Sequence, residues 1–419
     1  MQRSRKPEIR SLRSPEAAAL GRELRLVLCD DGAGNNLGDR AIHTAVLEHL
    51  EALCPEVRIA CHHHVAKGSQ LASAWLKLAW DILHSDVFLH GGGHPYSDGT
   101  SGGFLCCSSW PVLFAHAVGK PAIAYGVGVG PFQSALGRRL AKLALPRLHC
   151  IYPRDEESYQ ACVASGVDPA RLHRTVDPVL WSSLDRLART PASDSESPRD
   201  LSSPLVVVIP RRWGHYKAHL LPSKFIPSAR RQARVESVRL ASLFAQVCDR
   251  LISELGAHVV FLSMRASGGR FDPGQDDDGL GQEIRAAMNH REGVLDTPAL
   301  FEPGDLCPWL RAASLTISMR MHGCILSARM GTPFLSLAYH AKGLALTRAL
   351  EIPECGLSLS EASAETLWER LEYLWPRLPD LSERLHGGQQ RLAALGQDAW
   401  KALGRDLAEL SSRLSPPAR

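Results

Sequence analysis

The chain has 419 residues, of which 45% are hydrophobic and 22% charged. This length is too great for one comfortable core, so two domains are expected. The formal net charge of +4 is small for the length. It argues against a dedicated nucleic-acid binder, whose basic residues would dominate one face. A cleft lined with arginine for an anionic substrate remains compatible with this charge.

The cysteine and hydropathy patterns indicate a cytoplasmic protein. Eleven cysteines are present, an odd number without any Cys-x-x-Cys pair, which favours reduced thiols over a disulfide framework or a zinc ribbon. No uncharged apolar run approaches the roughly 20 residues of a membrane-spanning helix. Any membrane contact is therefore expected to be peripheral, at the inner face. Nothing in the sequence calls for a metal or an organic cofactor, and the oligomeric state stays open.

In chain order, apolar runs alternate with amphipathic stretches, the pattern of βαβ units in a parallel sheet. The first half predicts strands at residues 24–29, 57–61, 86–90, 122–125 and 150–153, with helices at 40–53, 111–118 and 156–165. The second half predicts strands at 205–210, 258–263, 315–318 and 334–338, with helices at 235–255, 324–330 and beyond about 361.

Residues 186–204 separate the two halves. They are rich in Ser, Pro and charge and have no period, so they are predicted to be an interdomain linker. The sequence thus predicts an α/β protein with two Rossmann-like domains, at residues 20–185 and 205–410.

The chemically distinctive residues come immediately after the predicted strands, where open α/β sheets bind their ligands. They are Asn36, Gly38, Asp39, Gly92, Gly93, Asp98, Gly128, Arg154, Arg211, Arg320 and His322. The glycines allow a ligand to approach the backbone closely. They fit neither the dinucleotide-binding fingerprint nor the P-loop.

Residues 318–323 carry the strongest single signal. Arg320 and His322 alternate on a segment expected to be extended, so their side chains should share one side. A guanidinium can grip a carboxylate or phosphate, and an imidazole can move a proton near neutral pH. The alternative is that His322 caps a helix and Arg320 pairs with a surface acid.

Structural alternatives also stay open elsewhere. Arg154 could pair with Asp155 or Glu156, and the arginines at 211 and 212 could lie in a solvated turn. The run at 61–64, Cys-His-His-His, is not expected to bind metal because adjacent side chains on a strand diverge. The three aspartates at 276–278 are expected to lie in a solvated loop.

Taken together, these segments resemble the polysaccharide pyruvyl transferase family over residues 24–345. The resemblance rests on Asn36-Leu37-Gly38-Asp39, Gly91-Gly92-Gly93 with Asp98, Gly128-Val129-Gly130-Pro131, Arg154-Asp155 with Ser158 and Asp177, Arg211-x-Trp213, Ser318-Met319-Arg320-Met321-His322 and Tyr339-x-x-Lys342. The chain departs from the family pattern at His94-Pro95-Tyr96 and in a basic insertion at 214–234.

The resemblance implies a glycosyltransferase-B-like (GT-B-like) pair of domains with an interdomain cleft, the N-terminal one on the acceptor side. It also implies phosphoenolpyruvate as donor and a carrier-linked or nucleotide-linked sugar as acceptor, joined as a ketal. Arg154, Arg211 and Arg320 would hold the donor, and His322 would be the general acid. Lys342 is assigned to substrate binding, and Asp39 or Asp98 to the base.

Two other functions remain possible from sequence. A nucleotide-sugar-dependent glycosyltransferase on the same plan would need an acid-rich ribose contact in the second domain, where arginines stand instead. A non-catalytic sugar- or anion-binding relative would have no need of Arg154, Arg320 and His322 together.

Overall fold

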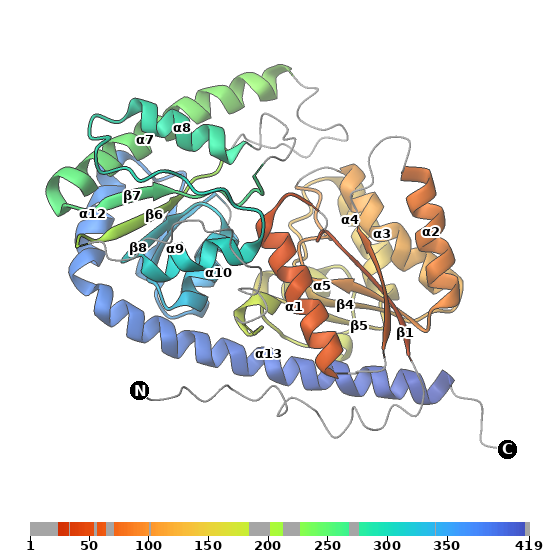
Figure 1. Cartoon of the computed structure of the whole chain (residues 1–419). Coiled ribbons are helices and arrows are strands. Elements are labelled where there is room, and N and C mark those ends of the chain that lie inside the picture. The colour runs from red at the N-terminus through yellow and green to blue at the C-terminus, as the bar shows by residue number, and fades with distance from the viewer. Residues whose placement is uncertain are drawn as a thin grey trace.

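A computed structural model describes residues 24–32, 34–53, 57–63, 71–99, 102–183, 202–212, 227–267, 276–339 and 341–414. The predicted linker at 186–204 and the insertion at 214–234 therefore lie largely outside the described residues. The chain forms two five-stranded parallel sheets side by side, each in its own half of the molecule (Figure 1).

The N-terminal half has the strand order β2-β1-β3-β4-β5. Its elements are β1 (Arg25–Asp30), α1 (Leu37–Leu53), β2 (Arg58–His63), α2 (Leu71–His84), β3 (Val87–Gly91), α3 (Gly102–Ala117), β4 (Ala122–Val127), α4 (Ala135–Ala144), β5 (Cys150–Pro153) and α5 (Glu156–Ala164). Strands β3, β4 and β5 are buried at every position, as expected for a parallel sheet covered by helices on both faces.

The C-terminal half has the strand order β10-β9-β8-β6-β7. Its elements are β6 (Leu205–Ile209), α7 (Pro227–Leu255), β7 (His258–Phe261), α8 (Asp277–Ala287), α9 (Cys307–Ala312), β8 (Leu315–Ser318), α10 (Met321–Met330), β9 (Phe334–Ala338), α11 (Ala341–Ala349), β10 (Gly356–Ser358), α12 (Ala364–Leu374) and α13 (Leu378–Leu414). The predicted pair of Rossmann-like α/β domains is confirmed.

Helix α13 joins the two halves. It has 37 residues and runs along one side of the whole molecule (Figure 1). Trp400 and Leu403, in its second half, belong to the same buried cluster as Leu50 of α1. Tyr152, at the end of the N-terminal sheet, donates a hydrogen bond to Asp406 at 2.6 Å. The terminal helices were assigned to the C-terminal domain, but the end of α13 packs on the N-terminal one instead.

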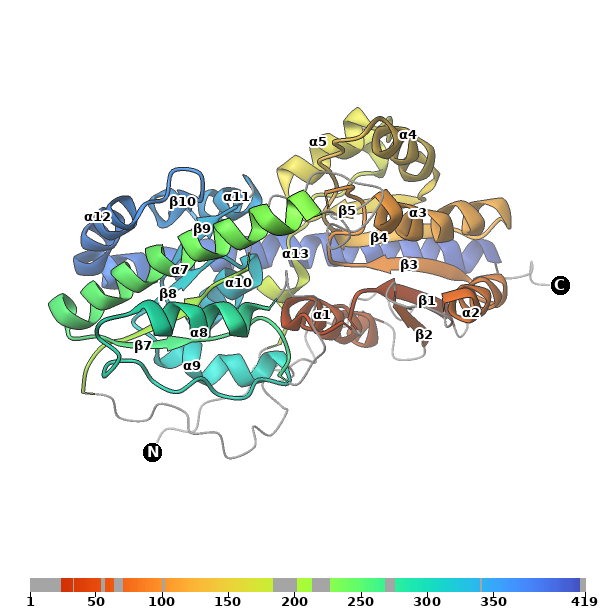
Figure 2. The same cartoon turned by 90° about the horizontal axis from the view of Figure 1, so that it is seen from above.

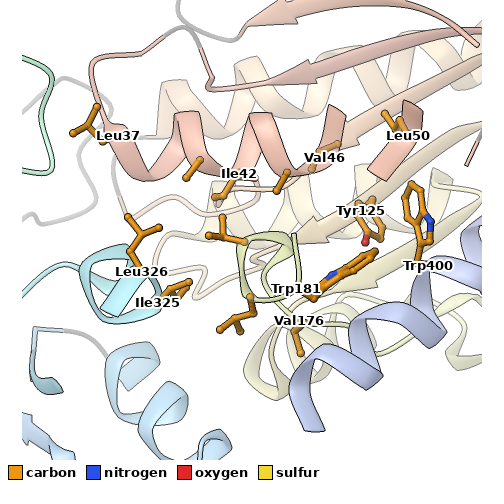
Figure 3. Packing of buried hydrophobic residues seen from close by; sticks show 14 of the residues in the cluster. Leu37, Ile42, Val46, Leu50, Tyr125, Val176, Trp181, Ile325, Leu326 and Trp400 are labelled. Atoms are coloured by element: carbon orange, nitrogen blue, oxygen red, sulfur yellow. The ribbon is translucent and has the colours of Figure 1, made fainter. Parts of the chain in front are cut away.

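The contact between the halves is an apolar core. Leu37 of α1 and Ile325 and Leu326 of α10 belong to one buried cluster, in which Trp181 also lies (Figure 3). Backbone hydrogen bonds fix the same contact, because the N–H of Leu37 donates to the Met264 carbonyl at 2.9 Å. The first turn of α1 is therefore held against the C-terminal half.

Ten of the eleven cysteines lie in the described residues, all as free thiols and most of them buried, as the sequence predicts. Across the described part of the chain, no helix is both long enough and apolar enough to cross a bilayer.

Candidate active site

His322 lies in the first turn of α10, at the contact between the halves. The helix begins at Met321 with Arg320 as its N-cap, so the segment is not extended at His322 and the expected alternation is wrong. A Cβ atom placed on Gly38 would lie 2.5 Å from His322 Nδ1. The imidazole thus occupies the space that a side chain at position 38 would need, and Gly38 permits this approach.

Asp177 connects His322 to Arg154. Its Oδ2 lies 3.4 Å from His322 Nε2 and accepts a hydrogen bond from Arg154 Nη1 at 2.8 Å. The Asp177 and Arg154 side chains are only 5% and 6% exposed. Burial alone would raise the pKa of Asp177, but His322, Arg154 and the N–H of Val179 outweigh it, so the pKa lies below its usual value.

Two nitrogens in this cluster lack a hydrogen bond. Among the described residues, neither His322 Nε2 nor Arg154 Nε has a hydrogen-bond partner, although both are buried. Arg154 Nε lies 3.8 Å from Asp155, within range for charge attraction only. Buried polar atoms are rarely left unsatisfied, so these two nitrogens indicate a place where a polar ligand can bind.

Asp39 is a second carboxylate close enough to His322 for their charges to interact. It accepts a hydrogen bond from Asn36 Nδ2 at 2.7 Å, while the N–H of Gly38 donates to Asn36 Oδ1 at 3.1 Å. Desolvation by the surrounding protein raises the pKa of Asp39, although His322, Asn36 and the nearby arginines 265 and 320 partly offset this. A carboxylate whose pKa is raised beside an imidazole is suited to accept a proton.

Two further groups at this place were missed from sequence. Burial and the charges of Asp39 and Asp30 raise the pKa of Asp31 well above its ordinary value. Arg265 forms an isolated bridge with Asn36 through the backbone, and its charge acts on Asp39. Neither residue belongs to a recognisable motif, so no pattern in the sequence pointed to them.

Arg320 is paired within its own half. Its Nε donates to Asp277 Oδ2 at 2.9 Å, and both side chains are buried. The other oxygen of Asp277 accepts from the N–H of Arg212 at 3.3 Å. The prediction of a solvated loop at 276–278 is therefore wrong for Asp277, which is the buried first residue of α8. Asp276 is the N-cap of that helix.

Arg211 reaches the same edge of the C-terminal sheet. Ile209 of β6 pairs with Ser318 of β8, and this is the last pair of the two strands. Arg211 and Arg320 each lie two residues after that pair. The Arg211 guanidinium lies over the Tyr339 ring, 4.5 Å from its centroid. The side chain of Lys342 lies outside the described residues.

The two glycine loops lie together at the edge of the N-terminal sheet. Gly92 and Gly93 have positive φ, and the N–H of Gly128 donates to the Gly93 carbonyl at 2.8 Å. A Cβ on Gly126 would lie 2.6 Å from the ring of Pro178, which follows Asp177. These loops therefore support the turn that holds Asp177.

Asp98 has a different role from the one expected. Its Oδ1 accepts from the N–H of Gln133 at 2.8 Å, and its Oδ2 accepts from the N–H and hydroxyl of Ser134 at 2.7 and 2.6 Å. Both oxygens are thus engaged in holding the start of α4. This argues against Asp98 as the base and leaves Asp39, which lies beside His322.

Apart from Asp98 and Lys342, the predicted residues fall into three groups. Those gathered around His322 are Asn36, Gly38, Asp39, Arg154 and Arg320. Gly92, Gly93 and Gly128 lie next to the turn of Asp177, and Arg211 lies at the facing sheet edge. In the described part of the chain, no group of three or more His, Cys, Asp or Glu side chains is placed to hold a metal ion.

Solved structures share this architecture. HepE of Anabaena, in complex with UDP and glucose, superposes with a TM-score of 0.55 at 11% identity, covering 93% of this chain and 100% of that one. A UDP-N-acetylglucosamine 2-epimerase from Rickettsia bellii gives 0.55 at 11% identity, with 94% and 99% covered. At such low identity these similarities concern the fold, which is GT-B-like.

Sequence comparison identifies the family. The chain is 26% identical over 270 residues to the amylovoran biosynthesis protein AmsJ of Erwinia amylovora, covering 60% of this chain and 59% of that protein. The chain thus spans about three-fifths of that relative's length. The sequence model of the polysaccharide pyruvyl transferase family matches residues 36–341. This range includes every residue gathered around His322. The chain belongs to the polysaccharide pyruvyl transferase family.

Proposed function

We propose that this chain transfers the pyruvyl unit of phosphoenolpyruvate onto two hydroxyls of a sugar, as a ketal, during synthesis of a polysaccharide or glycoconjugate. The observation that carries the proposal is the surroundings of His322: its buried Nε2 lies 3.4 Å from Asp177 Oδ2, and its charge also acts on Asp39, both carboxylates coming from the other half. Membership of the family supports the same chemistry.

His322 acts first, as the general acid. It gives a proton to the methylene carbon of phosphoenolpyruvate, and the adjacent carbon becomes an oxocarbenium-like centre. One sugar hydroxyl then attacks that centre, and Asp39 accepts the hydroxyl proton. Because Asp39 lies beside the imidazole, it can return this proton to His322.

Phosphate leaves in the second stage. The bond between the central carbon and the phosphate oxygen breaks, and a second sugar hydroxyl attacks the same carbon. The proton of this hydroxyl departs with the phosphate. Two hydroxyl protons are thus accounted for, one in the new methyl group and one on hydrogen phosphate, and the products are the ketal and inorganic phosphate.

Arginines bind the two anionic groups of the donor in this proposal. An arginine has five N–H donors, of which Arg320 uses two on Asp277, while the Nε of Arg154 makes no hydrogen bond within the described chain. Arg211 supplies a third guanidinium from the facing sheet edge. The carboxylates of Asp177 and Asp277 keep the buried guanidinium groups in place before the donor arrives.

A direct assay tests the proposal. The purified chain is incubated with phosphoenolpyruvate and a panel of carrier-linked and nucleotide-linked sugars, while phosphate release and the mass of the sugar are followed. We expect release only with a matching acceptor, whose mass increases by one pyruvate ketal. Release of UDP from a UDP-sugar, without use of phosphoenolpyruvate, would instead assign the chain to the glycosyltransferases. Binding of a sugar without either reaction would assign it to the non-catalytic relatives.

A further inference from the structure

Helix α2 carries an apolar surface that no other element covers among the described residues. Its inner side is formed by Leu78 and Ile82, which are buried in the core. Its outer side is apolar as well, since Leu76 is 72% exposed and Trp80 62%, with Trp75 and Leu83 also exposed. An ordinary surface helix places polar residues on this side.

The apolar surface continues onto α3. The Trp75 and Trp110 rings have centroids 5.4 Å apart, and Trp110 contacts Phe114 in turn. Helices α2 and α3 pack together, as do α3 and α4. The three helices lie beside one another on the side of the N-terminal sheet opposite α13 (Figures 1 and 2). We call this three-helix surface, formed by α2, α3 and α4, the outer face.

The charge of the outer face is almost entirely positive. Residues 99–154 contain no Asp or Glu. Helix α4 exposes Arg138, Arg139 and Lys142 together with Leu136, and α2 exposes Lys77. The one acid of α2, Asp81, lies 2.6 Å from the imidazole of His62.

We propose that the outer face binds the surface of a bilayer containing anionic phospholipids. Exposed Trp and Leu side chains enter the boundary between headgroups and acyl chains, and the amphipathic Trp ring is suited to that depth. The cations of α4 and Lys77 meet the lipid phosphates. The helices lie on the membrane and do not cross it. A protein partner would need both an apolar surface and acidic residues to match the cations. A second copy of this face would instead bring cations against cations.

Vesicle flotation tests the proposal with the full chain. The protein is mixed with vesicles of phosphatidylcholine alone, or of phosphatidylcholine with phosphatidylglycerol. We expect it to float with the anionic vesicles, and less as salt is raised. Replacing both exposed tryptophans, Trp75→Ala and Trp80→Ala, should weaken binding by roughly tenfold or more, because binding scales with the apolar area inserted.

A charge variant separates the two contributions. The triple change Arg138→Gln, Arg139→Gln and Lys142→Gln should weaken binding to anionic vesicles by roughly fivefold per cation, about a hundredfold in all, and leave binding to neutral vesicles unchanged. The matched control removes three cations from the C-terminal half: Arg285→Gln, Arg311→Gln and Arg377→Gln. Tyr373→Ala, an exposed aromatic on α12, is the control for the tryptophans.

Several results would overturn the proposal. The unchanged protein could fail to float with anionic vesicles at low salt, or the control variants could weaken binding as much as the outer-face variants. A dimer seen by light scattering and abolished by the tryptophan changes, without vesicle binding, would assign the face to a second copy. Circular dichroism and thermal unfolding verify that each variant is folded. No donor or acceptor is needed, so the result is independent of the proposed activity.

Discussion

Two histidines lie at the contact between the halves, and their surroundings are opposite in kind. His49 of α1 is buried in the apolar core, stacked on Trp181 with ring centroids 3.5 Å apart. Neither of its ring nitrogens has a hydrogen bond among the described residues. Burial, with a contribution from the charge of Arg329, lowers its pKa to about 3. His322 of α10 instead lies close to Asp39 and Asp177.

The difference shows what makes a histidine suitable for proton transfer. An imidazole among indole rings is held neutral by desolvation and contributes mainly as a flat apolar surface. An imidazole beside carboxylates has neighbours that stabilise its charge and can exchange protons with it. His49 is 3% exposed and the His322 side chain 12%, so a low exposure alone does not distinguish them.

The comparison predicts that only His322 is needed for turnover. His322→Gln keeps a polar side chain but cannot donate a proton to carbon, so we expect kcat to fall by roughly 10²–10⁴-fold. Binding of phosphoenolpyruvate, followed by calorimetry, should change little. His49→Phe is the matched variant and should leave kcat within a few-fold of the original. Loss of donor binding in His322→Gln, with no separate effect on turnover, would contradict the acid role.

The carboxylate beside His322 should have the next largest effect. Asp177→Asn keeps the shape of the side chain but removes its charge. We expect kcat to fall by about 10²-fold, the lower end of what general acid–base catalysis contributes, with the KM for phosphoenolpyruvate altered less.

Asp168→Asn is the control for this change. Asp168, like Asp177, precedes a proline and caps a short 3-10 helix through its carboxylate, but it is exposed. A purely structural role for Asp177 would give both variants the same small loss of stability and the same kcat.

His49 should control how stability depends on pH. Its pKa of about 3 in the folded state lies below the value of about 6.5 in the unfolded chain, so protons bind preferentially to the unfolded state as pH falls. The stability is complete above about pH 6.5 and is lost as pH falls toward 3, by about 2 kcal/mol at pH 5. His49→Phe keeps a flat ring and should remove this loss.

Urea unfolding at pH 7 and pH 5 measures the effect. The drop in unfolding free energy between the two pH values should be about 2 kcal/mol smaller in His49→Phe than in the unchanged protein. An equal drop in both proteins would mean that His49 is charged in the folded state, and the contrast with His322 would fail.

Most strands of the two sheets could be predicted from the sequence. Strands β5, β8 and β9 have the predicted bounds, because short apolar runs between polar turns are distinctive. Several helix starts were predicted too late, although α5 begins at Glu156 as predicted. Pro111 was taken as the beginning of α3, but the helix starts at Gly102 and contains the proline. Helix α2 was not predicted; its inner and outer sides both carry large apolar residues, unlike those of an ordinary surface helix.

The site was predictable only in part, because local sequence patterns do not show which distant residues the fold brings together. Arg154, Arg320 and His322 follow strands, and strand ends can be located from local patterns. Their partners Asp177 and Asp277 are separated from them by long stretches of chain, and the fold alone brings them together. Asp277 in particular stands in a run of acids beside glycines, which locally resembles a solvated loop.

The smallest expected effect concerns Gly38, which brings the two halves of the site together. Gly38 does not have positive φ, so alanine suits the helix, yet its Cβ would lie 2.5 Å from His322 Nδ1. The imidazole must shift away from Gly38, which alters its position against Asp177, and we expect kcat to fall about tenfold with little change in thermal stability. Gly102→Ala, also in the first turn of a helix but with no atom within 4 Å of the new Cβ, should leave kcat unchanged. If Gly38→Ala were equally silent, the position of His322 against α1 would not matter for catalysis, and its resemblance to His49 as a packed interface residue would be the better description.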